Sequence, residues 1–145
     1  MKKSERLRTL IRIEEVKERE EARKLIEFQK LVEENKRKLS DLQDYLEEYK
    51  YKFSEIGHTG TEAAKLRSSF AFIGQLNAVI SQQQKAVLDV EHAADEYREN
   101  WIRAKQRVDI LEKAISKLRD QERRRELKLE QVLTDESARH RRRDL

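Results

Sequence analysis

The 145-residue sequence contains no cysteine and no proline, and it has only three glycines. Without cysteine there is no disulfide framework and no thiol chemistry. Without proline no helix is interrupted from within, so the chain favours long helices. No apolar run approaches the roughly 20 residues that a membrane-spanning helix needs. The basic start also lacks the apolar segment of a signal peptide. We therefore expect a soluble protein of the cytoplasm.

Charged residues make up 43% of the chain and hydrophobic residues only 37%, too few for the thick core of a compact domain. Such a composition occurs in disordered chains, but also in long helices that share a narrow apolar seam. The formal net charge is only +4, from 33 basic and 29 acidic residues. This near-balance is typical of charge-laced helix surfaces rather than of a dedicated nucleic-acid binder.

The apolar residues recur at alternating steps of three and four positions, which is the period of a coiled-coil seam. From Leu25 to Ile56, nine of the ten seam positions are apolar or aromatic. From Leu66 to Val132, sixteen of the twenty seam positions are. This regularity argues against disorder and predicts two long helices.

The stretch Ser54–Leu66 separates the two seams and holds two of the three glycines. Gly57 suits the left-handed position after a helix end, and Thr59 with Glu62 matches a helix-starting capping box. A connection this short makes the two helices antiparallel. The sequence therefore predicts an all-α fold, a single antiparallel coiled-coil hairpin. Its expected parts are a helix over about 4–56, a turn at Gly57–Gly60, a helix over about 61–136 and a frayed basic tail over 137–145.

Folding the chain at this turn sets one seam against the other. Val32 then faces Val87, and the two polar seam residues of this region, Asn35 and Gln83, also fall opposite each other. Their side chains can form an amide–amide hydrogen bond that fixes the register of the helices. The alternative is that both amides are merely tolerated near the surface.

The seam weakens toward the N-terminus, where Glu14, Glu18 and Glu21 take seam positions. We expect a stutter or a local bend there. The first helix runs out of residues opposite about position 117. From Leu118 onward the second helix is therefore expected to extend alone or to fray.

The sequence lacks the residue patterns of a catalytic or metal-binding protein. His58, His92 and His140 stand far apart, and none has the spacing of a metal ligand. There is no Gly-rich phosphate loop and no nucleophile elbow. Two helices also offer no concave, water-excluding pocket. We therefore expect a non-enzyme with no catalytic, cofactor-binding or metal-binding residue, no small-molecule substrate and no nucleic-acid partner.

One flank of the predicted hairpin is more apolar than the other. Tyr45 and Phe72 lie on it near the turn, whereas the opposite flank is mostly polar apart from Phe70. A two-helix fold has no third helix to cover such a patch, and exposed aromatic patches usually mark a partner site. The alternatives are that these rings thicken a thin seam, or that the chain oligomerises there.

Three stretches resemble the FliJ family of flagellar type III export proteins: "LQDYLEEY" (42–49), "FAFIGQLNAVISQQ" (70–83) and "YRENWIRAKQRVDILEKA" (97–114). The likeness covers nearly the whole chain. It implies a non-enzymatic antiparallel coiled coil, similar to the rotor stalk of F- and V-type ATPases. It further implies a place at the inner membrane, peripherally associated with the export apparatus, and a role in motility and chemotaxis.

The resemblance also implies partners. These are the export ATPase ring, the cytoplasmic domain of the membrane export gate and, in addition, export chaperones. The chain would link ring to gate and so promote the export of flagellar proteins. The ring is expected to bind residues of about 1–24 and 110–140, at the end of the hairpin that holds both termini.

The family's gate-contacting pattern falls on the apolar flank found from the seam. The matching residues are Leu42, Tyr45, Tyr49, Phe72, Leu76 and Val79. The polar positions beside this pattern fall on Lys38 and Gln83, where the sequence departs from the family's usual Gln and His. Gln83 can therefore be interpreted either as a gate contact or as a structural partner of Asn35.

Three other functions fit parts of the sequence. An equivalent coiled-coil stalk of a virulence type III secretion system would share the fold and the mechanism. A generic coiled-coil spacer or scaffold would need no exposed aromatic flank. A rotor subunit of a rotary ATPase would need a longer chain with a globular insertion between its helices.

Overall fold

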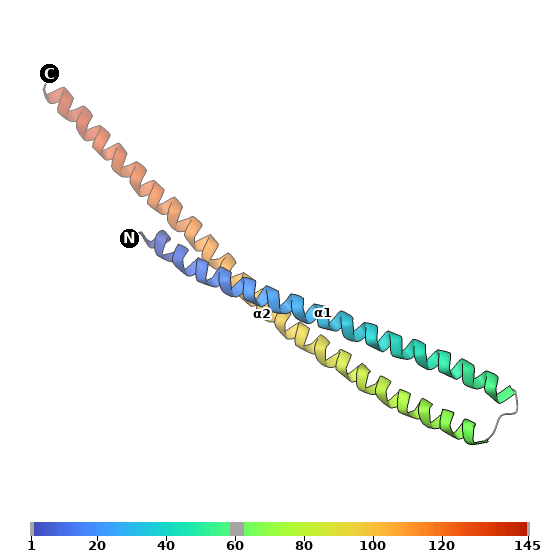
Figure 1. Ribbon diagram of the computed structural model, residues 1–145. Coiled ribbons are helices and arrows are strands. Elements are labelled where there is room, and N and C mark those ends of the chain that lie inside the picture. Colours follow the sequence, from blue (N-terminus) through green and yellow to red (C-terminus); the bar gives the residue numbers. More distant parts are fainter. Residues whose placement is uncertain (1, 59–62, 145) are drawn as a thin grey trace. The chain divides into compact units, whose positions relative to one another are not determined.

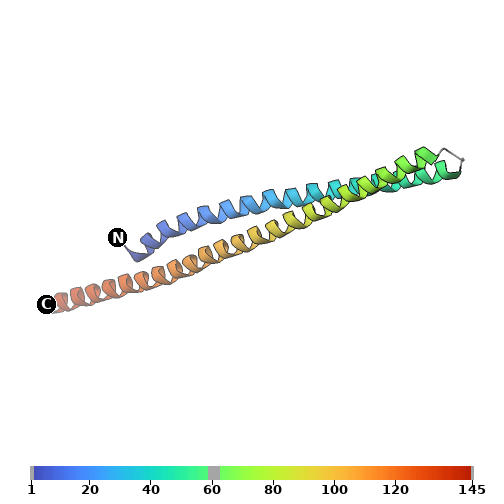
Figure 2. The same cartoon turned by 90° about the horizontal axis from the view of Figure 1, so that it is seen from below.

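A computed structural model describes residues 2–58 and 63–144. Within these residues it consists of two helices, α1 (Lys3–His58) and α2 (Ala63–Arg143), and has no strand. The helices run antiparallel and pack against each other (Figures 1 and 2). The predicted all-α antiparallel hairpin is therefore confirmed.

Contacts between residues divide the chain into two units. The turn unit is Glu21–Trp101, and the terminal unit combines Met1–Glu20 with Ile102–Leu145. Each unit contains one stretch of α1 and one of α2.

The helix ends differ from the expected ones. α1 continues to His58, so Gly57 lies inside the helix rather than after its end. The predicted capping box of Thr59 and Glu62 lies outside the described residues. α2 continues to Arg143, so residues 137–143 are helical where a frayed tail was expected. Neither glycine nor proline interrupts this part of α2, and positive charge in the last turn of a helix interacts favourably with the helix dipole.

The turn unit is built on the predicted seam. Its least exposed side chains recur at steps of four and seven, which are positions of the predicted seam, and they are Leu25, Val32, Ser69, Leu76, Ile80, Val87 and Ala94. The rings of Phe28 and Tyr97 lie 4.6 Å apart. A knob in a coiled coil sits among several residues of the facing helix, so this ring pair belongs to the seam.

The terminal unit has its own small core. Ile11, Val108 and Ile115 form a buried cluster, and Leu7 and Leu111 pack against it. Burying one such side chain contributes about 1.5–3 kcal/mol. This cluster therefore fixes the start of α1 on α2.

The glutamates of the seam do not shift its frame. From Ser4 to Phe53 the less exposed residues of α1 keep the spacing of three and four, so the predicted stutter is not observed. In the terminal unit, the carboxylate of Glu14 lies 3.5 Å from Lys17 Nζ and 3.4 Å from Arg107 Nε. Nearby positive charges compensate a carboxylate for part of its lost hydration. Glu14 can therefore hold a seam position without displacing its neighbours.

The pairing of α1 with α2 in the terminal unit ends in polar contacts. Ser4 Oγ donates to Glu122 Oε2 at 2.8 Å, and Ser4 N donates to Glu122 Oε1 at 3.4 Å. The carboxylate thus accepts a backbone N–H that the first turn of a helix leaves without an intrahelical partner. One turn further along α2, Glu126 Oε1 lies 2.8 Å from Lys2 Nζ. The hydrogen bond and the charge of this pair raise the pKa of Lys2 and lower that of Glu126.

Apart from the pair of Lys2 with Glu126, α2 has no partner helix beyond Glu122 among the described residues. Every described residue from Arg123 onward is exposed, and we call Arg123–Arg143 the overhang. The sequence placed its start near Leu118, but Leu118 and Glu122 are still partly covered. The difference arises because the side chains of Lys2 and Ser4 reach further along α2 than the predicted register allowed.

Candidate partner-binding surface

Three aromatic side chains form a cluster in the turn unit, contributed by both helices. Tyr45 and Tyr49 lie on α1, and Phe72 lies on α2. The ring centroids of Tyr49 and Phe72 are 4.6 Å apart, and those of Tyr45 and Phe72 are 6.2 Å apart in an edge-to-face arrangement. Both distances are within the range of favourable aromatic pairs. We call these three residues the aromatic cluster.

The exposure of the side chains in the aromatic cluster increases from the seam toward the surface. Tyr49 is half-buried, and its hydroxyl lies 3.3 Å from Ser69 Oγ. Phe72 is also half-buried, whereas Tyr45 is 48% exposed. The inner rings therefore hold Tyr45 in place, and an outer ring held in this way is suited to contact a partner.

The other residues that the sequence predicts as gate contacts differ in their accessibility. Val79 is 44% exposed, Leu42 is half-buried and Leu76 is only 7% exposed. Leu76 is therefore a core residue that supports this surface from below. Val79 extends the accessible apolar area along α2, one heptad beyond Phe72.

A polar margin adjoins the aromatic cluster. Gln83 Nε2 donates to Asn35 Oδ1 and to the Asn35 carbonyl oxygen, both at 3.0 Å. The amide–amide contact predicted from the register is thus present, and Asn35 Nδ2 donates in turn to Leu31 O at 2.8 Å. Lys38, Asp41, Leu42 and Gln83 line a shallow depression beside it. Nothing in the seam pattern marks Asp41, the acidic residue of this depression.

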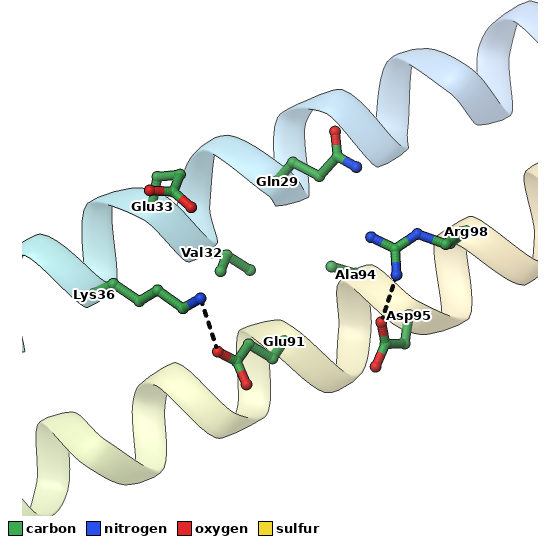
Figure 3. A pocket seen from close by; sticks show the side chains of 8 residues that line it. All are labelled: Gln29, Val32, Glu33, Lys36, Glu91, Ala94, Asp95 and Arg98. Carbon is green, nitrogen blue, oxygen red and sulfur yellow. Dashed lines mark hydrogen bonds and ion pairs between the residues drawn. The ribbon is translucent and has the colours of Figure 1, made fainter.

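The opposite flank of the turn unit is mainly charged. Figure 3 shows Val32 and Ala94 facing each other between the helices, at the base of a groove. Lys36 Nζ lies 3.4 Å from Glu91 Oε1 on the rim of this groove. Ion pairs of this kind at a solvated surface contribute little to binding a partner. The groove is therefore a gap between two small seam residues with a charged rim.

One aromatic pair stands outside this division. The rings of Phe53 and Phe70 lie 5.0 Å apart near the turn, and Phe70 is 64% exposed. Both flanks of the turn unit therefore expose an aromatic ring. Among the residues that the structure describes, only the flank with Tyr45 adds a third aromatic ring, that of Tyr49, to its pair.

The described residues contain neither a metal-binding cluster nor a helix that could span a membrane. Residues 2–58 and 63–144 contain no group of three His, Cys, Asp or Glu side chains placed to hold a metal ion. None of the described helices is long and apolar enough to cross a membrane.

Comparison with known families identifies the chain. Residues 2–144 match the family described as "Flagellar FliJ protein". The chain belongs to the FliJ family. Comparisons with curated proteins and with solved structures gave no match. Membership covers nearly the whole chain, so the resemblance read from three stretches is confirmed.

FliJ membership supports a role related to flagellar protein export. The family is one of non-catalytic flagellar proteins.

Proposed function

We propose that this FliJ-family chain is a non-enzymatic stalk that couples the export ATPase ring to the cytoplasmic domain of the membrane export gate. In this proposal the turn unit binds the gate and the terminal unit binds the ring. Ring and gate are thereby connected by one chain, peripherally associated with the export apparatus at the inner membrane. Export chaperones are further partners of the same apparatus.

The aromatic cluster is the observation that carries the gate contact. Tyr45 offers a half-exposed ring held by Phe72, and Val79 adds apolar area beside it. Aromatic anchors that are already fixed in place lose little conformational freedom on binding, and they dominate many interfaces. Lys38 and Gln83 form the rim of this surface, and the rims of protein interfaces are commonly polar.

The contact with the ATPase ring is supported by the exposed overhang of the terminal unit. The overhang is exposed along its length and ends in four consecutive basic side chains, His140 to Arg143. A single helix with an uncovered apolar seam can insert between other subunits, as helix-in-groove complexes do. Residues of about 1–24 and 110–140 remain our proposed ring-binding region.

The gate assignment is tested by two alanine variants with matched controls. Tyr45→Ala and Phe72→Ala each remove one ring of the aromatic cluster. Each should weaken binding of the isolated gate domain by about 30-fold or more, the loss typical of a hot-spot residue. Tyr51→Ala is the control for tyrosine, because Tyr51 is 68% exposed and lies away from the cluster, and Phe70→Ala is the control for the opposite flank.

The binding measurement is calorimetric titration of each variant with the gate domain and, separately, with the ATPase. Circular dichroism checks that helix content is retained. The proposal predicts that gate affinity falls while ATPase affinity is unchanged. If Tyr45→Ala lowers ATPase binding and leaves the gate untouched, the two units have been assigned to the wrong partners. If Phe70→Ala is as damaging to gate binding as Phe72→Ala, the aromatic cluster is not the contact.

The flagellar description of the family favours a flagellar stalk over the stalk of a virulence secretion system. It also favours a dedicated export role over a generic spacer. Export assays in a motile strain that lacks the protein separate these possibilities, because only a flagellar stalk should restore filament proteins to the medium.

A further inference from the structure

The overhang carries an apolar stripe that no other part of the described chain covers. Leu129, Val132 and Leu133 are 61%, 53% and 55% exposed. Leu129 and Val132 continue the seam frame of α2 beyond Glu122, its last partly covered position, and Leu133 lies beside them. Seam positions in coiled coils are normally covered by a second helix. The stripe is therefore incomplete as it stands.

The charges around this stripe change sign from one end to the other. Arg125 and Lys128 precede it, and Asp135 and Glu136 follow it. None of these four side chains forms an ion pair within residues 2–58 and 63–144. Along the seam and the flank that carries Lys128, the order is positive, then apolar, then negative; the acidic Glu126 lies on the other flank and pairs with Lys2. The stripe therefore complements a reversed copy of itself and repels a copy that runs in the same direction.

From this pattern we infer that the overhang pairs antiparallel with the overhang of a second copy of the chain. Seam position Leu129 then meets Val132 of the second copy, and seam position Arg125 meets its Glu136. Beside the seam, Lys128 comes near Asp135 of the second copy. A twofold axis repeats each contact, as in any isologous dimer.

The length of the pairing is limited by α1. Beyond Glu136 the second copy reaches the level of Glu122, which already accepts hydrogen bonds from Ser4. The interface therefore covers only residues of about 125–136. A contact this short is weak, and we expect a dissociation constant on the order of 0.1 mM at low salt. Added salt should weaken it further, because the charged pairs at its margins are exposed.

This pairing is independent of the proposed function, because it needs only the purified chain. It would nevertheless cover the overhang that the proposal assigns to the ATPase ring. Ring subunits and a second copy would then compete for one surface, and self-pairing would hold free chains away from the ring at high concentration.

Charge exchange tests the pairing. Arg125→Glu places two carboxylates together at both symmetry-related contacts, and Glu136→Arg places two guanidinium groups there. Each single variant should associate at least tenfold more weakly than the unaltered chain. When the two variants are mixed, every contact again joins opposite charges, so a mixed dimer should form with near-original strength. Arg124→Glu makes the same charge change on an exposed residue outside the seam and should have little effect.

The measurement is sedimentation equilibrium of the full chain, 17.4 kDa as a monomer, at concentrations up to about 1 mM and at low and high salt. Rescue by mixing establishes the antiparallel pairing. A chain that remains monomeric at about 1 mM and low salt overturns it. So does association that both variants leave unchanged. If these variants weaken only binding of the ATPase, the overhang is a site for the ring and the self-pairing is wrong, whereas the proposed function stands.

Discussion

Replacing Gln83 with alanine tests whether the amide pair contributes to the hairpin. The neighbouring residue provides an unusually close control. Gln82 lies on the same turn of α2 but is exposed and outside the seam. Gln82→Ala makes the same chemical change and the same change in helix propensity. The difference between the two variants therefore isolates the contacts that Gln83 makes with α1.

The structure sets the expected size of this difference. Gln83 Nε2 makes two hydrogen bonds at 3.0 Å, one to Asn35 Oδ1 and one to the Asn35 carbonyl oxygen. Each neutral hydrogen bond contributes about 0.5–1.5 kcal/mol net. Because both bonds are only partly buried, we expect the lower part of that range for each. Gln83→Ala should therefore lower the free energy of unfolding by about 1–2 kcal/mol relative to Gln82→Ala.

The assay is urea unfolding followed by circular dichroism at 222 nm, with both variants and the unaltered chain measured together. Asn35→Ala, alone and combined with Gln83→Ala, completes a double-mutant cycle. Its coupling energy should be about 0.5–1.5 kcal/mol for the bond between the two side chains. If Gln83→Ala is no more destabilising than Gln82→Ala, the amides are merely tolerated near the surface. The register would then rest on the apolar seam alone.

Three further outcomes are expected. Ile11→Ala should lower the free energy of unfolding by about 2–4 kcal/mol, because it opens a cavity in the buried cluster of the terminal unit. Ile13→Ala, at a half-exposed position, should lower the free energy of unfolding far less in the same assay. Glu126→Gln should return the pKa of Lys2 toward its ordinary value in an NMR titration, because Glu126 is what raises it. The Lys2–Glu126 pair contributes its full stabilisation of the fold between pH 4.5 and pH 10.5, the ordinary pKa values of the two groups. This stabilisation is lost as the pH falls through the lowered pKa of Glu126 or rises through the raised pKa of Lys2. A titration in which neither group responds to loss of the other would contradict this. Two or three residues inserted at 57–60 should leave the unfolding free energy within about 0.6 kcal/mol, because closing a slightly longer loop costs little and the seams fix the register; a larger loss would mean that the turn sets the register.

The seam could be predicted from the sequence because it depends on a simple repeat. Steps of three and four bring residues to one face of a helix whatever their neighbours are. The positions from Leu66 to Leu118 named by that repeat are all buried or half-buried in the structure. The contact between Asn35 and Gln83 followed from the same repeat, since both residues interrupt otherwise apolar seams at matching distances from the turn.

The end of the pairing was harder to predict. A period says where the seam lies but not how far side chains reach beyond the last backbone layer. Lys2 and Ser4 extend toward Glu126 and Glu122, so α1 covers more of α2 than residue counting suggested. The absence of a stutter at the charged seam residue Glu14 was also hard to predict. The cation that accompanies Glu14 belongs to Arg107 on the other helix, and no pattern within α1 reveals it.

The aromatic cluster was only partly predictable. The flank that carries Tyr45 and Phe72 followed from the seam frame. Which of the six gate-pattern residues are accessible did not follow, because burial depends on the packing of both helices. Leu76 proves to be core, whereas Tyr45 and Val79 stay accessible. This distinction makes the last two the sharper targets for mutation.

The central claim is that one chain joins the ATPase ring to the gate through different units. The most direct measurement immobilises the ATPase and asks whether the gate domain is retained only when this chain is added. Our account predicts retention with the unaltered chain and with Tyr51→Ala, and its loss with Tyr45→Ala although that variant still binds the ATPase. Retention of the gate domain without the chain, or unchanged retention with Tyr45→Ala, would contradict it.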